Sequence, residues 1–122
     1  MPELAGLKVL VVEDEGGVAL LIEDMLEALG CEVAASVATL AAALEVATVE
    51  DFDFAVLDVN LDGQLIFPVA EILRNRGLPF IFSTGYGRIG VPDTFKECEV
   101  LNKPFAIAEL EWKLRSALEN RR

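Results

Sequence analysis

The sequence predicts an α/β fold built on a doubly wound, five-stranded parallel sheet. Short apolar runs alternate five times with amphipathic or polar segments along the chain. Most of these runs are rich in β-branched or aromatic residues and end in a polar residue, as strands buried on both faces of a sheet do. Parallel strands also need crossover connections, which cover the sheet with helices. The length of 122 residues, of which 53% are hydrophobic, predicts one domain spanning residues 1–122.

The first half of the chain contains two predicted strands and two predicted helices. Residues 7–12 are almost wholly apolar and run into an acidic group, which indicates a buried strand. Apolar positions recur every three or four residues across residues 18–29, and Gly30 follows as a stop signal, so a helix is expected there. A short apolar strand over residues 31–35 and an alanine-rich helix over residues 39–46 come next.

The same alternation continues through the middle of the chain. Residues 54–57 form an apolar run that ends at Asp58, which indicates a third strand. Residues 68–75 are predicted to be helical, with Gly77 just beyond them as the stop signal. Residues 80–83 form the fourth apolar run and again lead into a polar residue.

The last third of the chain is less regular. Residues 85–102 hold three glycines and Pro92, which disfavour a long helix, so a shortened or irregular fourth helix is expected near residues 91–96. Residues 99–102 are typical of a short fifth strand. Beyond Pro104 the apolar residues line one face of a final amphipathic helix.

Composition and charge exclude several classes of function. With 21 acidic and 10 basic residues the net charge is −11, which repels a phosphate backbone and argues against binding to nucleic acid. The absence of histidine excludes His-based triads, His-ligated metals and a phosphohistidine relay that originates here. No apolar run reaches the length of a membrane helix, and the start shows no secretory signal pattern. Two cysteines without a CxxC motif favour a reduced, cytoplasmic protein with no membrane contact.

Polar residues follow the predicted strands at the points where the strands end. They are Glu13, Asp14, Asp58, Thr84 and Lys103. The carboxyl ends of parallel strands share one edge of the sheet, so these side chains are expected to share a pocket. Clustered carboxylates repel one another without a cation, and a site made only of oxygen donors favours Mg²⁺. A carboxylate, a hydroxyl and an ammonium beside Mg²⁺ suit phosphoryl transfer, in which cations neutralise the phosphoryl oxygens while a carboxylate attacks.

These residues stand in motifs that resemble those of the receiver domain of two-component response regulators. The resemblance covers the whole chain and implies a (βα)5 fold of the flavodoxin and receiver type. Its specificity comes from the combination of all four motifs, each placed directly after a predicted strand. The motifs are Glu13-Asp14, Asp58-Val59-Asn60, Thr84-Gly85 and Lys103-Pro104-Phe105.

The resemblance also implies a role for each matching side chain. Asp58 is similar to the phosphoacceptor of the family. Thr84 would bond a phosphoryl oxygen, and Lys103 would pair with the phosphoryl group. The expected Mg²⁺ ligands are Asp14 and Asp58 directly, Glu13 through water and Asn60 through its backbone carbonyl.

The fourth motif narrows the class. Residues 79–87 are similar to the sequence of the FAT GUY receivers, which are mostly small, single-domain bacterial regulators named for a Phe-Ala-Thr-Gly-x-Tyr run. Ser83 replaces the alanine of that run. Most receivers carry Tyr or Phe three residues before the lysine as a rotameric switch, whereas this chain has Val100 there. The usual aromatic switch therefore cannot operate in this protein.

The resemblance implies a response regulator that accepts a phosphoryl group from a sensor histidine kinase or a histidine phosphotransfer protein. It would catalyse its own phosphotransfer and dephosphorylation without being a conventional enzyme. It would signal by phosphorylation-dependent binding to a downstream protein or by phosphoryl relay.

Three alternatives stay open at this stage. A Mg²⁺-dependent aspartyl-phosphate phosphatase would use similar chemistry, but such enzymes typically place Asp-x-Asp after their first strand. A pseudo-receiver would act as an interaction module, but it would usually lack the acceptor, an acid or the lysine. The chain is alternatively a receiver excised from a larger protein.

Overall fold

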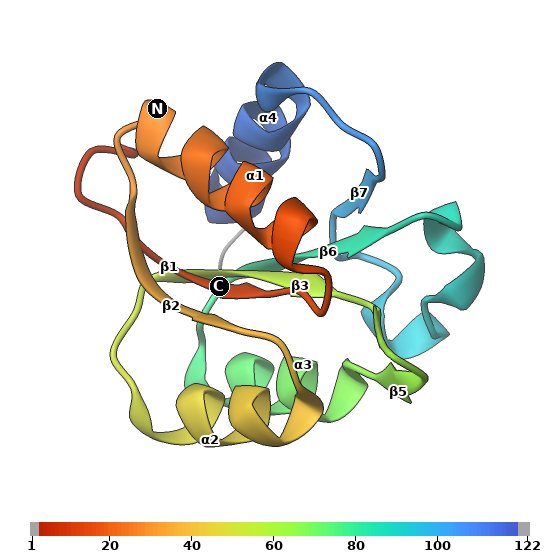
Figure 1. Ribbon diagram of the computed structural model, residues 1–122. Helices are drawn as coiled ribbons and strands as arrows, with labels where there is room; N and C mark the ends of the chain where they lie inside the picture. Colours follow the sequence, from red (N-terminus) through yellow and green to blue (C-terminus); the bar gives the residue numbers. More distant parts are fainter. Residues whose placement is uncertain (1–2, 120–122) are drawn as a thin grey trace.

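A five-stranded, all-parallel sheet forms the centre of the computed structural model, which describes residues 3–119 (Figure 1). The strand order is β2-β1-β3-β6-β7. The connection from β2 to β3 therefore passes over β1, and β6 and β7 then follow on the far side of β3. The strands are β1 (Lys8–Val12), β2 (Glu32–Val37), β3 (Phe54–Asp58), β6 (Phe80–Thr84) and β7 (Val100–Asn102). This order confirms the predicted doubly wound sheet.

Four α-helices cover the sheet within the described residues, two on each face (Figure 1). The helices are α1 (Gly16–Ala28), α2 (Leu40–Val49), α3 (Phe67–Arg76) and α4 (Ile107–Glu119). Figure 1 shows α1 and α4 on one face and α2 and α3 on the other. All four lie where the apolar periodicity predicted helices, although α2 extends three residues further than expected.

The apolar residues form two separate cores, one on each side of the sheet. Every residue of β3 and β6 is buried, and alternate side chains of these strands enter opposite cores. Leu57 and Phe82 belong to the core that α2 and α3 cover. Val56 and Ile81 belong to the core that α1 and α4 cover. The unbroken apolar runs in the sequence reflect this burial on both faces.

Local signals fix the ends of two helices. The Thr39 hydroxyl accepts a hydrogen bond from the Ala42 N–H at 3.1 Å, so Thr39 caps α2 at its N-terminus. Gly77 ends α3 with a φ of 72°, a left-handed conformation that glycine adopts without strain. Gly77 therefore ends α3 as predicted. Thr39, which was expected to be the first residue of the second helix, is instead the N-cap that precedes it.

A short hairpin after β3 was absent from the sequence prediction. Strands β4 (Asn60–Leu61) and β5 (Gln64–Leu65) pair antiparallel around a turn at Asp62 and Gly63, whose φ angles are 52° and 91°. Asp-Gly is the turn dipeptide that such a tight hairpin favours, so the signal was present in the sequence. Each strand is only two residues long, which is too short for an alternating pattern.

Two short 3₁₀ helices replace a regular helix between β6 and β7. They are η1 (Gly87–Gly90) and η2 (Asp93–Phe95), in agreement with the predicted shortened or irregular fourth helix. Phe95 packs its ring against Phe67, Phe80 and Phe82, with centroid separations of 5.7, 6.2 and 5.6 Å. This aromatic cluster belongs to the core on the α2–α3 side of the sheet.

Arginine side chains also hold the η1–η2 segment. Arg74 of α3 lies 4.2 Å from the Phe95 ring centroid and donates to the Thr94 carbonyl at 2.8 Å. Arg88 donates to the backbone carbonyls of Cys98, at 2.9 Å, and of Lys96. These bonds give the irregular backbone partners that a helix would supply internally.

Other sequence expectations are visible in the fold. Val100 is buried in the core on the α2–α3 side, at the position where the resemblance led us to expect an aromatic switch residue. Both cysteines are free thiols, with Cys31 buried and Cys98 half-buried. Among residues 3–119, no helix has the length and apolar character needed to cross a membrane.

Candidate functional site

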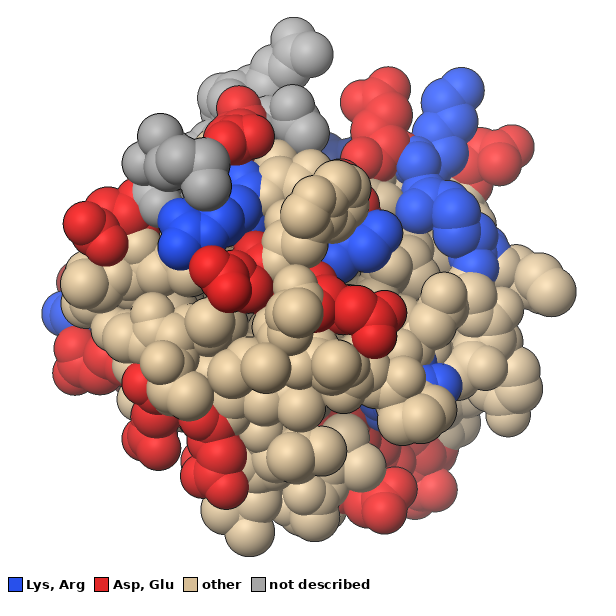
Figure 2. All heavy atoms as spheres, turned by 90° about the horizontal axis from the view of Figure 1, so that it is seen from above, with Lys and Arg blue, Asp and Glu red and all other residues tan. Residues whose placement is uncertain are grey.

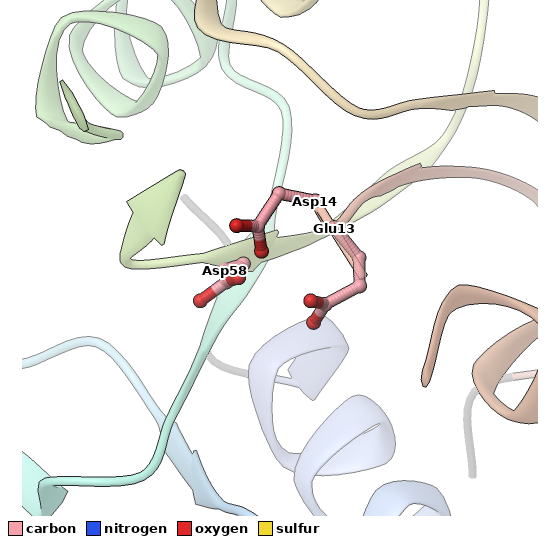
Figure 3. A group of neighbouring side chains, drawn as sticks. All are labelled: Glu13, Asp14 and Asp58. Carbon is pink, nitrogen blue, oxygen red and sulfur yellow. The ribbon is translucent and has the colours of Figure 1, made fainter. Parts of the chain in front are cut away.

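Three carboxylates converge at the carboxyl edge of the sheet (Figure 3). Glu13 and Asp14 directly follow β1, and Asp58 is the last residue of the neighbouring strand β3. One oxygen of each lies within 4.8 Å of the others. Glu13 and Asp58 are buried, with 2% and 5% of their surface exposed, whereas Asp14 faces solvent. Such close carboxylates form a strongly negative site that calls for positive charge.

Lys103 supplies part of that charge. Its ammonium Nζ lies 2.7 Å from Glu13 Oε1 and 3.3 Å from Asp58 Oδ2. The Lys103 N–H donates to the Thr84 carbonyl at 2.9 Å, which fixes the backbone just beyond the β6–β7 pairing. The Lys103 side chain, which follows β7, therefore links the ends of β1 and β3 through its ammonium group.

The proton affinities of the site residues follow from this crowding. Burial raises the pKa of Asp58 to about 7, and the negative charge of Glu13 adds to the rise while Lys103 opposes it. Burial alone would raise the pKa of Asp14, but hydrogen bonding with Asp58 and Glu13 and the charge of Lys103 lower it overall. Burial would lower the pKa of Lys103, but its carboxylate partners raise it. Added positive charge would therefore favour the ionised, nucleophilic form of Asp58.

Backbone N–H groups orient the two buried carboxylates. The Asn60 N–H donates to Asp58 Oδ1 at 3.3 Å, and the Glu15 N–H donates to Glu13 Oε2 at 3.1 Å. The Asn60 side chain accepts from the Gly63 N–H at 2.6 Å, so the β4–β5 hairpin holds Asn60 beside Asp58. The hairpin that the sequence analysis missed thus positions one of the predicted site residues.

The structure places two hydroxyl groups at the end of β6. Thr84 is buried at the same edge of the sheet, and its Oγ1 accepts from the Tyr86 N–H at 3.1 Å. No hydrogen bond joins the Thr84 hydroxyl to the site carboxylates within residues 3–119. Ser83 is 1% exposed, and its hydroxyl has no hydrogen-bond partner in the described part of the chain. In the sequence, Ser83 stands out only as a departure from the FAT GUY run and not as a site residue.

The donor set fits a hard divalent cation. The convergent groups are carboxylate oxygens, with the Asn60 backbone next to them, and the described residues of the site include no sulfur or imidazole ligand. Mg²⁺ takes oxygen ligands and retains several waters, which suits a site with one exposed side. Beside Asp14 lies a hollow of ≈ 330 Å³, bounded by the β2–α2 connection and the β4–β5 hairpin. The Asp14 side of the cluster is therefore open to small ions.

Comparisons with known proteins agree on one family. The family model for the response regulator receiver domain matches residues 9–115. The solution structure of SdrG from Sphingomonas melonis Fr1 is 39% identical and has a TM-score of 0.83, over 97% of this chain and 99% of that one. The receiver domain of PhyR from Erythrobacter litoralis is 27% identical, with a TM-score of 0.84 over 99% of this chain and 96% of that one.

A third structure bears on the acidic cluster. The receiver domain of sensor histidine kinase PA1611 from Pseudomonas aeruginosa PAO1 is 27% identical and has a TM-score of 0.77, over 95% of this chain and all of that one. It was determined with a magnesium ion coordinated in its active site cleft. No curated protein sequence matches this chain significantly. The family match covers most of the chain, and the chain therefore belongs to the response regulator receiver domains of two-component signalling.

Proposed function

We propose that this chain is a phosphoacceptor that takes a phosphoryl group onto Asp58 in a Mg²⁺-dependent reaction. The observation that carries the proposal is the buried Asp58 carboxylate, which lies 3.3 Å from the Lys103 ammonium and within 4.8 Å of two further acids. Among the described residues, Glu13 and Asp58 are the buried carboxylates of this cluster and both contact Lys103, but Asp58 alone of the two ends a strand of the sheet. We further propose that residues 1–122 act as one cytoplasmic receiver.

The reaction follows from the positions of these groups. An ionised Asp58 oxygen attacks the phosphorus of phosphohistidine, the P–N bond breaks, and its electron pair leaves with the imidazole, which gains a proton. Mg²⁺ would be held by Asp14, Asp58, the Asn60 carbonyl and, through water, Glu13, and it supplies positive charge for the phosphoryl oxygens. Lys103 moves from its carboxylate partners to the new phosphoryl group.

The sources and targets of the phosphoryl group are proteins. Receiver domains interact with kinases or with downstream proteins, and this chain would accept from a sensor histidine kinase or a histidine phosphotransfer protein. Figure 2 views the α1–α4 side of the molecule and shows acidic side chains around a broad uncharged area. Four large hydrophobic side chains are exposed on these two helices: Leu20, Leu21, Ile107 and Trp112. An apolar partner surface would cover them.

Acetyl phosphate tests the proposal directly, because it donates to carboxylates without a kinase. The purified chain is incubated with acetyl phosphate and Mg²⁺, and the acyl phosphate is trapped with borohydride and located by mass spectrometry. We expect stoichiometric modification of Asp58, loss of modification in Asp58→Asn, and none when EDTA is present. Asp51→Asn is the matched control, since Asp51 is exposed and precedes β3 rather than ending it.

Several outcomes would contradict the proposal. Label at another residue would move the acceptor, and label that survives EDTA would remove the metal from the reaction. An unmodified wild-type chain that also fails to bind beryllofluoride would favour the pseudo-receiver alternative.

A further inference from the structure

Ser83 stands in the same row of side chains as the proposed acceptor. Side chains alternate between the two faces of a parallel sheet, and residues paired in register point to the same face. Ser83 pairs with Asp58 in the β3–β6 register. Their predecessors Val56 and Ile81 both lie in the core under α1 and α4, so the next residues in each row, Asp58 and Ser83, project on that side of the sheet edge.

The other members of that row are also site residues. On β1 the row continues from Val11 to Glu13, and beyond β7 it continues from Leu101 to Lys103. Ser83 pairs with Leu101 in the β6–β7 register, so it lies between the strand that carries Asp58 and the strand that leads to Lys103. A small hydroxyl side chain thus occupies the centre of the row in which the buried ion pairs form.

The Ser83 hydroxyl has no hydrogen-bond partner in this arrangement of the described residues. Its Oγ is buried and unpartnered, although the Ser83 carbonyl accepts from the Val59 N–H at 3.0 Å and the strand backbone is therefore fixed. Buried hydroxyls are nearly always satisfied, and an exception beside a functional site indicates a partner that arrives in another state. Alanine would fill the same space without this unsatisfied group, so packing does not explain the serine.

We propose that the Ser83 hydroxyl is a donor reserved for the phosphorylated state, in which it hydrogen-bonds an oxygen of the acyl phosphate on Asp58. The inference rests on the function proposed above. Phosphorylation brings new acceptor oxygens to the register partner of Ser83 and draws Lys103 away from the carboxylates. The hydrogen bond then exists only after modification, so it stabilises the phosphorylated form relative to the resting form. Ser83 would act in addition to Thr84, which follows it on β6 with its side chain on the alternate face.

Beryllofluoride binding measures this difference at equilibrium, because the complex mimics a phosphoryl group on an aspartate. Amide shifts of wild type and Ser83→Ala are followed during titration with beryllofluoride at fixed Mg²⁺, and unfolding midpoints are measured without it. We expect Ser83→Ala to bind beryllofluoride about threefold to tenfold more weakly, or about 0.6 to 1.4 kcal/mol. We expect its resting midpoint to be equal to or above that of wild type, because an unsatisfied hydroxyl has been removed.

Two further variants separate hydrogen bonding from volume and from general effects. Ser83→Cys keeps the side chain's size but has only a weak donor, so it should bind as weakly as Ser83→Ala. Ser36→Ala removes a hydroxyl from β2 of the same sheet, where it is exposed and bonded to Glu23, and should bind like wild type.

Each outcome decides one question. Equal affinities of wild type and Ser83→Ala, or full affinity in Ser83→Cys, would overturn the role of the hydroxyl. A lower resting midpoint in Ser83→Ala would also overturn it, because the hydroxyl would then be bonded before modification. Failure of the wild type to bind beryllofluoride, or to be modified at Asp58, would instead contradict the proposed function.

Discussion

At the scale of single residues, the site is a balance between buried negative charge and one lysine. Glu13 and Asp58 lose nearly all contact with water, and Lys103 is the cation that contacts both. Buried charges are tolerated when they are paired. When one partner is lost, the other charge stays buried with nothing to compensate for its desolvation. Neutralising the Asp58 carboxylate and removing the Lys103 cation should therefore have opposite effects on the stability of the fold.

Asp58→Asn should stabilise the metal-free protein more strongly at pH 8 than at pH 5. The pKa of Asp58 is raised to about 7 in the folded state, from about 3.9 in an unfolded chain. Between these values the folded state holds a proton that the unfolded chain has released, so wild-type stability falls as pH rises toward 7. The neutral amide avoids this loss, which grows by roughly 2–3 kcal/mol between pH 5 and pH 8.

Urea denaturation at both pH values, in EDTA, measures this difference. Asp51→Asn again serves as the control and should show no pH-dependent gain. A gain for Asp58→Asn that is the same at pH 5 and pH 8 would contradict the raised pKa.

Lys103→Met should have the opposite effect. The variant keeps most of the aliphatic stem but leaves two buried carboxylates without their cation, so we expect a loss of about 2–4 kcal/mol at pH 8. Some phosphorylation of Asp58 should remain, but it should no longer change the amide shifts of the η1–η2 segment. Lys113→Met is the matched control, because Lys113 pairs with Glu99 at 3.2 Å in a more exposed setting on α4. Equal losses in the two variants would refute a special role for the buried cation.

At the scale of elements, the η1–η2 segment is the least regular part of the fold. It holds its path through arginine bonds to backbone carbonyls and through the Phe95 ring, and it has only short stretches of internal hydrogen bonding. Segments with few internal bonds open at low free energy. Because the segment begins just after Thr84, a pull on the Thr84 side chain by a phosphoryl group would act on the path of the backbone. Such a switch needs no aromatic residue at Val100.

Hydrogen exchange tests the opening of this segment. We expect amides 88–96 to exchange faster than those of β6 in the unmodified protein and to gain protection when beryllofluoride binds. Arg88→Gln should raise exchange across amides 88–96, because it removes the bonds to Lys96 and Cys98. Arg76→Gln, which loses bonds to Ala47 and Glu50 instead, should leave these amides unchanged. Strong protection that beryllofluoride does not alter would indicate a rigid segment.

At the scale of the whole molecule, Mg²⁺ should act as a stabilising ligand. The net charge is −11, and the densest buried part of it lies at the edge of the sheet. A ligand that binds only the folded state stabilises it by about 1.4 kcal/mol at ten times its Kd. We therefore expect Mg²⁺ to raise the thermal midpoint more than NaCl of equal ionic strength. Asp14→Ala should abolish the extra rise in thermal midpoint that Mg²⁺ gives over NaCl. Asp24→Ala, on the exposed surface of α1, is the control and should retain that extra rise. An excess that survives Asp14→Ala would place the ion elsewhere.

Much of this architecture could be predicted from the sequence because its signals are local. Strands buried on both faces produce unbroken apolar runs, and Gly77 marks the end of a helix through its own backbone preference. The proximity of Glu13, Asp14, Asp58 and Lys103 followed from parallel strands sharing one edge. The missed features depend on tertiary context: the β4–β5 hairpin is too short for a periodic signal, and the lack of a partner for Ser83 depends on its neighbours across strands.

The separation of the two cores by the sheet has a consequence for how such a protein changes in evolution. Substitutions in one core should have free energies that add to those in the other, since residues without shared partners do not couple. The aromatic cluster around Phe95 lies wholly in the core on the α2–α3 side. A change from a helix to two 3₁₀ turns on that side would therefore leave the packing on the α1–α4 side in place. Residues on one face of the sheet can therefore change while the packing on the other face is preserved.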